Sequence, residues 1–391
     1  MFASGSSLKL GTLFGIRIGV SASWFLFLFV VLYFATERFR DTLGIETGGA
    51  FAVAVAAAAL FFGSILLHEL GHALAARREG IEVAGIDLFL FGGVMKMSRE
   101  GGSAGAMFRI AVAGPAMTLL IVVLAGGAGL ALAGSEQTLE AAQLDAIGGT
   151  TALEQLISLL FALNLVLLVF NLLPALPLDG GQILRSAVWG ASKDRGKGTR
   201  VAAVLGQGLG YLLMAYGVYE LLLQDATFSG LWSIGLGFLI LQGARQATAQ
   251  EAFTERLDGV TVADVMDPEP VTIAAGTSVA EAWDTAFERY RDAPWFAVTE
   301  EDGRFVGVAH RAAVQDVLAG ADGLTVRQVA TAGEPDAHVA ADESLETLIG
   351  SEPLRRHGAL MALDRDGRLQ GVVTVEQVSR ALHAQLAPLR E

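Results

Sequence analysis

The chain has 391 residues, of which 53% are hydrophobic and 17% are charged, and its mean hydropathy of +0.50 is too high for an ordinary soluble protein. It contains no cysteine, which excludes disulfides, thiolate nucleophiles and cysteine-ligated metals. Of its formal charge of −14, −13 falls after residue 250, where 25 acidic and 12 basic residues and no lysine make nucleic-acid binding unexpected.

Six uncharged or nearly uncharged runs are each about long enough to cross ~30 Å of hydrocarbon as a helix. The runs are 18–36, 51–67, 110–135, 155–178, 201–219 and 226–244. The first is too long and too weakly cationic at its start to be typical of a cleaved signal peptide. We therefore expect a multi-pass α-helical membrane protein with six transmembrane helices over residues 1–250.

The basic residues predict the orientation of these helices. If both ends of the six-helix domain lie on the same side of the membrane, the segments on that side hold 13 of the 15 Lys and Arg residues of the first 250. The opposite side then holds only Arg38 and Arg40. The positive-inside rule then puts both termini in the cytoplasm of a cell membrane. The acidic, lysine-free tail would suit a salt-rich cytoplasm such as that of a halophile, where salt screens surface repulsion. In this arrangement the second helix runs inward and ends near the cytoplasmic side.

The sequence His68-Glu69-Leu70-Gly71-His72 ends that second helix. On a helix, the HExxH spacing places two imidazoles on one face, one turn apart, as a zinc ion requires, with the glutamate beside them as a general base. Ionisable groups next to a membrane span are costly to keep there, which favours a functional explanation.

The third ligand of the metal must be a carboxylate, because the other four histidines lie in the soluble tail and there is no cysteine. The fourth helix also runs inward and brings Asp179 to the depth of the histidines, where Pro174 and Pro177 end the regular helix. A solvated aspartate in a simple helix-ending turn is the alternative. The carboxylates near the spans are Asp87, Glu100, Asp179, Glu220 and Asp225, of which the last two flank the outer side.

Asn171 lies eight residues before Asp179. Its amide could donate a hydrogen bond to the oxyanion of a tetrahedral intermediate or hold a substrate strand. It could equally bind a neighbouring helix, as asparagines within membranes often do, and the sequence does not choose between these roles.

These motifs resemble the site-2 protease family of intramembrane zinc metalloproteases, in the branch with a C-terminal pair of CBS domains. The resemblance rests on His68-Glu69-Leu70-Gly71-His72 and on Asn171…Pro174…Pro177-Leu178-Asp179-Gly180. It implies one Zn²⁺ per chain, with His68, His72 and Asp179 as ligands and Glu69 as the catalytic base. It also implies that Asn171 and Pro177 help to seat the substrate, a transmembrane protein in the lipid bilayer.

Two further segments fit this family. Residues 83–97 are predicted as strands around Gly92 and Gly93, and in the family such a small membrane-associated hairpin is thought to pair with an unwound substrate. Gly114-Pro115 fits the start of the third helix of the family. The family often has Asn four residues after this glycine. This chain has Thr118 there, so we expect a weaker polar role.

The tail contains an internal repeat with an offset of 64 residues, which predicts a soluble α/β tandem pair of CBS domains. The repeat pairs Thr261 with Thr325 and Gly307 with Gly371. The expected boundaries are 1–250 for the membrane protease domain, 251–259 for a linker, 260–322 for the first CBS domain and 323–391 for the second. The stretch 246–257 is predicted to be helical.

CBS pairs resembling this one often bind adenosine nucleotides, through a Gly-x-x-Thr/Ser-x-x-Asp pattern. Both repeats here lack that aspartate, which leaves Thr374 as the best nucleotide-binding candidate. A structural role, or formation of a homodimer through the CBS domains, is an equal alternative.

The leading functional hypothesis is a metalloendopeptidase that hydrolyses transmembrane substrates near the cytoplasmic side of the membrane. The alternatives are a CBS-regulated metal transporter or channel and an inactive membrane scaffold. The hypotheses differ at Glu69, because a transporter needs no base beside its metal ligands while a hydrolase fails without one.

Overall fold

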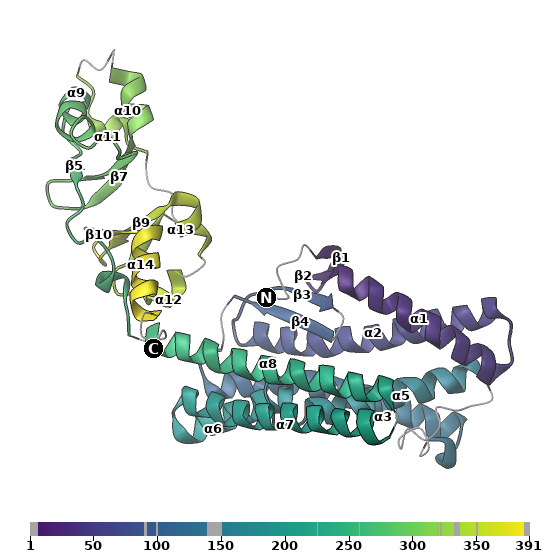
Figure 1. Ribbon diagram of the computed structural model, residues 1–391. Coiled ribbons are helices and arrows are strands. Elements are labelled where there is room, and N and C mark those ends of the chain that lie inside the picture. The colour runs from purple at the N-terminus through teal and green to yellow at the C-terminus, as the bar shows by residue number, and fades with distance from the viewer. Residues whose placement is uncertain are drawn as a thin grey trace. The chain divides into compact units, whose positions relative to one another are not determined.

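The computed structural model describes residues 7–89, 92–98, 101–138, 151–224, 226–257, 259–318, 320, 323–331, 337–348 and 351–386. The chain forms two compact units, Met1–Glu251 and Ala252–Glu391 (Figure 1). The first unit is built from long helices and one small sheet, and the second from short strands and helices.

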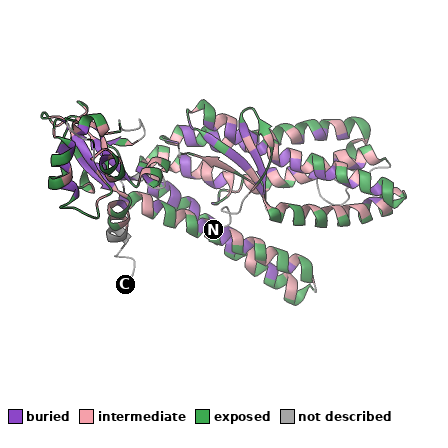
Figure 2. Cartoon of the chain, turned by 90° about the horizontal axis from the view of Figure 1, so that it is seen from above, coloured by how far each residue is buried: buried purple, intermediate pink, exposed green. Residues whose placement is uncertain are grey.

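Six helices of the first unit are long and apolar enough to cross a membrane, which confirms the predicted number. They are α1 (Ala22–Leu43), α2 (Thr47–Arg78), α3 (Ala104–Leu132), α5 (Ala152–Asn171), α7 (Arg195–Leu223) and α8 (Thr227–Leu257). Figure 2 shows that the outward faces of these helices are largely exposed. The exposed residues include Leu212, Leu222 and Phe228, as expected of surfaces that face lipid rather than water.

Most helix boundaries differ from the predicted runs by several residues, and two of these differences reveal a separate element. The first helix begins at Ala22 instead of residue 18, because Ile16–Val20 forms strand β2. The fourth, α5, ends at Asn171 instead of residue 178, and a short amphipathic helix, α6 (Asp179–Ser192), begins after the proline-containing segment. Asp179 is therefore the first residue of a helix and not part of a loop.

A four-stranded sheet packs against α2. Its order is β1 (Leu8–Leu13), β2 (Ile16–Val20), β3 (Val83–Phe89) and β4 (Gly92–Met97). The predicted hairpin over residues 83–97 is present as β3 and β4, while β2 pairs with β3 in parallel across a long stretch of sequence. Ile16, Val20 and Ile86 are fully buried beneath the sheet. Strand β4 lies at the edge of the sheet.

The second unit contains two three-stranded sheets, one from each repeat. Their strands are β5 (Thr272–Ala274), β6 (Trp295–Thr299), β7 (Phe305–His310), β8 (His338–Ala340), β9 (Ala359–Leu363) and β10 (Leu369–Thr374). The helices are η1 (Val262–Asp264), α9 (Val279–Ala282), η2 (Trp283–Phe287), α10 (Arg311–Leu318), α11 (Val326–Val329), α12 (Leu345–Leu348), α13 (Glu352–His357) and α14 (Val375–Leu386).

The two repeats exchange their first segments. Val262, from the start of the first repeat, is buried in the core of the second with Val339 and Leu345. Val326, from the start of the second repeat, is buried in the core of the first with Phe287. Each core is therefore completed by the other repeat.

Candidate metal centre

Helix α2 presents two imidazoles on one face. His68 and His72 are one turn apart, only 5% and 7% exposed, and their Nε2 atoms are 3.2 Å apart. This is the geometry that the i, i+4 spacing predicts for a helix.

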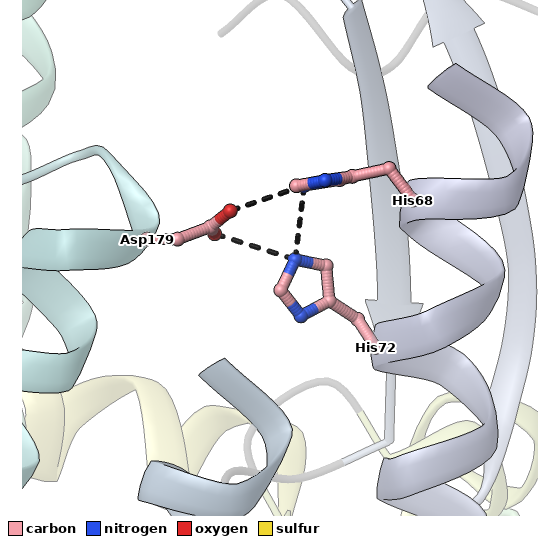
Figure 3. Close-up of side chains that lie close together, drawn as sticks. All are labelled: His68, His72 and Asp179. Atoms are coloured by element: carbon pink, nitrogen blue, oxygen red, sulfur yellow. Dashed lines mark hydrogen bonds and ion pairs between the residues drawn. The ribbon is translucent and has the colours of Figure 1, made fainter. Parts of the chain in front are cut away.

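The carboxylate of Asp179 reaches these imidazoles from α6 (Figure 3). Its Oδ2 lies 3.0 Å from Nε2 of His68, and its Oδ1 lies 3.3 Å from Nε2 of His72. The three residues thus converge although Asp179 is more than 100 positions further along the chain.

The other nitrogen of each imidazole fixes its tautomer. Nδ1 of His72 lies 2.7 Å from the carbonyl oxygen of Ile110, which can only accept, so Nδ1 carries the proton. Nδ1 of His68 lies 2.8 Å from the hydroxyl of Thr118, and that hydroxyl is directed to the carbonyl of Gly114 at 3.4 Å. Nδ1 of His68 is therefore also the donor. Both Nε2 lone pairs then point at each other and at a carboxylate, an arrangement that a cation would stabilise.

Thr118 has a stronger role than its sequence suggested. A polar role was expected to be weak after Gly114, and the structure places the fully buried Thr118 hydroxyl within hydrogen-bonding distance of His68. The signal in the sequence was a lone hydroxyl in an apolar helix, and only the packing of α3 against α2 shows its partner.

The donors fit zinc. Two imidazole nitrogens and one carboxylate are a usual protein ligand set for a catalytic zinc ion. Oδ2 of Asp179 is buried and accepts no hydrogen bond from any described residue, so it is available to a metal. The three residues could hold Zn²⁺ and leave a position for water or substrate.

The other carboxylates considered as ligands are engaged elsewhere or not described. Asp87 pairs with Lys96 at 2.6 Å, and Glu220 accepts a hydrogen bond from Ser233 at 3.0 Å. Burial acts to raise the pKa of Asp87, but hydrogen bonds from Lys96 and Ser7 outweigh it and hold that pKa below its ordinary value. Glu100 and Asp225 lie outside the described residues.

Glu69 lies against the edge strand β4. A β-carbon on Gly93 would come within 2.9 Å of Cδ and 3.0 Å of Oε1 of Glu69, so only glycine lets the strand approach this closely. Glu69 itself is half-buried and stands in the sequence between His68 and His72. A carboxylate, a candidate metal site and a strand edge are thus assembled around α2.

The remaining predicted site residues make no hydrogen bond with this cluster among the described residues. Asn171 is the half-buried last residue of α5, and no hydrogen bond of its side chain is found among the described residues. Pro177 is exposed and packs near Gly243 of α8. Thr374 belongs to the second unit, where its hydroxyl accepts from the backbone N–H of Gln377 at 3.2 Å and borders a cleft of about 540 Å³.

Comparison with known proteins identifies the family. Residues 56–215, which include His68, His72 and Asp179, match Peptidase family M50. The chain is 33% identical over 306 residues to "Putative zinc metalloprotease sll0528" of Synechocystis, a match that covers 78% of this chain and 76% of the relative. The chain belongs to the site-2 protease family.

Further known proteins are similar to parts of this chain. Rip3 of Mycobacterium tuberculosis, also named a zinc metalloprotease, is 30% identical over 80% of this chain and 76% of its own length. The solved site-2 protease of Methanocaldococcus jannaschii is 27% identical, with a TM-score of 0.41, over 62% of this chain and 95% of that one. Residues 262–320 match the CBS domain. The protein is a zinc metalloprotease of the membrane with a C-terminal CBS-type region.

Proposed function

We propose that this protein is an intramembrane endopeptidase that cuts transmembrane proteins near the cytoplasmic face of the bilayer. The observation that carries the proposal is the convergence of His68, His72 and Asp179 beside Glu69, within a unit of six apolar helices. Such a cluster of ionisable groups is expensive within a membrane unless it is used.

The residues divide the chemical work. His68, His72 and Asp179 would hold zinc, with Thr118 and the carbonyl of Ile110 orienting the imidazoles. When bound, zinc supplies a Lewis acid for the scissile carbonyl and the attacking water. Glu69 takes a proton from that water and later gives it to the leaving amine.

The substrate would bind as an extended strand. Among the described residues, no further strand pairs with the outer edge of β4, and Gly93 brings this strand against Glu69. Backbone pairing along such an edge is a general way to hold an extended peptide. A substrate helix would have to unwind first, and Asn171 and Pro177 would help to seat the unwound segment.

The site would face the cytoplasm. With six spans, both termini lie on the same side of the membrane, and the segments on that side carry 13 of the 15 basic residues of the first 250. The end of α2 that bears the HExxH motif would lie on this same side.

The C-terminal region, with CBS domains over 260–322 and 323–391, would regulate the protease. The cleft at Thr374 is lined by Trp295 and Phe296 and could take the base of an adenosine nucleotide. Dimerisation through this region is a second way in which it could act.

The test is cleavage of a model transmembrane peptide by the full-length protein in detergent, with bound zinc measured in the same samples. We expect Glu69→Gln to keep about one zinc per chain and to lose at least about 10²-fold in kcat. Glu46→Gln, at the exposed other end of α2, is the matched control and should cleave like the wild type. Metal binding without cleavage by the wild-type protein would contradict the proposal and favour a metal-handling or scaffold role.

A further inference from the structure

A second buried polar cluster lies in the first unit, away from the metal-facing residues. Its members are Arg185 of α6, Thr199 of α7 and Glu251 of α8, which are 7%, 2% and 6% exposed. Arg185 donates to Oε2 of Glu251 at 2.9 Å and to the hydroxyl of Thr199 at 2.8 Å. The hydroxyl of Thr199 donates to the same Oε2 at 2.8 Å.

The other oxygen of Glu251 is also engaged. Nε of Arg195, at the start of α7, lies 3.1 Å from Oε1. One carboxylate thus ties together α6, α7 and α8. Buried ion pairs of this kind seldom add net stability, because desolvation of the charges offsets their attraction. A positional role is a better explanation for keeping the Arg185–Glu251 pair.

Helix α6 connects this cluster to the metal-facing residues. The helix has only 14 residues, begins at Asp179 and carries Arg185 six residues later, about 9 Å along its axis. At its start, Gly181 lies so close to the backbone of Ala175 and Leu176 that no side chain would fit. Arg185 is thus a second point, besides the packing at Gly181, at which α6 and with it the Asp179 carboxylate are held.

We infer that Glu251 is a positioning residue for the metal centre: through Arg185 it holds α6 so that Asp179 faces His68 and His72. This inference rests on the proposed function. Helix α8 continues past Glu251 into the second unit, where Phe253 and Leu257 pack in the core. Glu251 is thus the point at which the helix leading to the CBS-type region is fastened to the helix that bears a metal ligand.

The test is a zinc titration of the full-length protein against a competing chelator. Glu251→Gln keeps the size of the side chain but removes the charge that holds both arginines. We expect it to raise the zinc Kd about tenfold, at the lower end of the loss seen when the support of a metal ligand is removed. Binding should still reach one zinc per chain at saturating zinc. Glu255→Gln, one turn further along α8 and exposed, is the control and should match the wild type.

A purely structural role predicts a different result. If Glu251→Gln unfolded part of the population, the number of zinc ions per chain would fall at saturation while the Kd of the remainder stayed unchanged, and the inference would be wrong. If Glu251→Gln bound zinc with the same Kd as the wild-type protein, the inference would also be wrong. The proposed function would stand, because the wild-type protein would still bind zinc and cleave the peptide. Absence of zinc binding or cleavage in the wild type would instead overturn the proposed function.

Milder variants keep the inference testable if Glu251→Gln does not fold. Thr199→Val removes one hydrogen bond from the same carboxylate without removing a charge, and Glu251→Asp keeps the charge on a shorter side chain. Each should raise the zinc Kd two- to fivefold and leave KM for the peptide unchanged, because neither residue touches the substrate. An unchanged zinc Kd in both variants would contradict the inference.

Discussion

The two units of the chain differ in whether they bury polar side chains. Among the described residues, the buried polar and charged side chains all belong to the first unit, from Ser64 to Glu251. The described cores of the second unit are apolar, although residues 252–391 carry 24 acidic and 12 basic residues, and the charged side chains described there are exposed or half-buried. The hydrophobic unit is therefore the one that buries ionisable groups.

This contrast suggests that the first unit carries the chemical function and that the second unit has mainly a structural core. A buried charge is costly in either unit, so it persists where it binds, reacts or positions something that does. In the first unit the buried charges gather at the metal-facing residues and at the Glu251 cluster. We expect substitutions there to alter zinc binding, and substitutions in the second unit to alter stability.

The largest effect should come from Gly114→Ala. A β-carbon at Gly114 would lie 2.6 Å from Cε1 and 2.7 Å from Cδ2 of His72, and it would push the imidazole away from Asp179. We expect zinc binding and peptide cleavage to fall below detection. Gly127→Ala on the same helix, where no atom lies within 4 Å, should leave zinc content at the wild-type level. Normal zinc content in the Gly114→Ala protein would show that the close contact of α3 with His72 does not determine zinc binding.

Thr118→Val should have a smaller effect on zinc binding. Valine keeps the shape of threonine but cannot accept the hydrogen bond from Nδ1 of His68. The zinc Kd should rise by about 10- to 100-fold, measured by chelator competition. Thr118→Ser, which retains the hydroxyl, should restore most of the affinity. Equal affinities for the valine and serine variants would argue against this role of the hydroxyl.

Phe287→Ala should test the other side of the comparison. Phe287 is fully buried in the core of the first repeat, and its removal should lower the free energy of unfolding of the second unit by about 3–5 kcal/mol. Denaturant unfolding monitored by tryptophan fluorescence would measure this loss, with the exposed Val375→Ala as the control. The zinc Kd should not change, and a large change would weaken the separation of roles.

The smallest effect is a pH dependence at Asp264. Hydrogen bonds from the backbone N–H and the hydroxyl of Thr261 lower the pKa of this carboxyl from its ordinary value of 3.8. The capping interaction is therefore fully present above pH 3.8 and is lost as the pH falls through the lowered folded-state pKa. Asp264→Asn should show a flatter decline in thermal stability than the wild type in this acidic range. Parallel declines would exclude a contribution from this cap.

The sequence predicted the parts of the molecule that depend on local spacing. The HExxH turn, the six apolar runs and the hairpin over residues 83–97 each follow from periodicity or length, although Gly92 and Gly93 pair within β4. Asp179 could be found by elimination because a chain without cysteine offers few ligands. The zinc-ligand and base roles themselves are still predictions.

The parts that the sequence missed depend on distant partners. Strand β2 pairs in parallel with β3 more than 60 residues later, so its last residues, from Ile18 onward, looked like the start of a membrane helix. The contact of Gly93 with Glu69 and the ion pair of Arg185 with Glu251 likewise join segments that no local pattern relates. Such contacts arise only when helices and strands pack.

The exchanged segments of the second unit have a consequence for synthesis on the ribosome. The segment that carries Val262 emerges early, but Val339 and Val373, which complete the core around it, are made roughly 80 to 110 residues later. That core cannot close until the chain has been made as far as Val373, because its earliest and latest segments must meet. A nascent chain halted after the first repeat would therefore expose the apolar face of its Val262 segment, which a chaperone would have to cover.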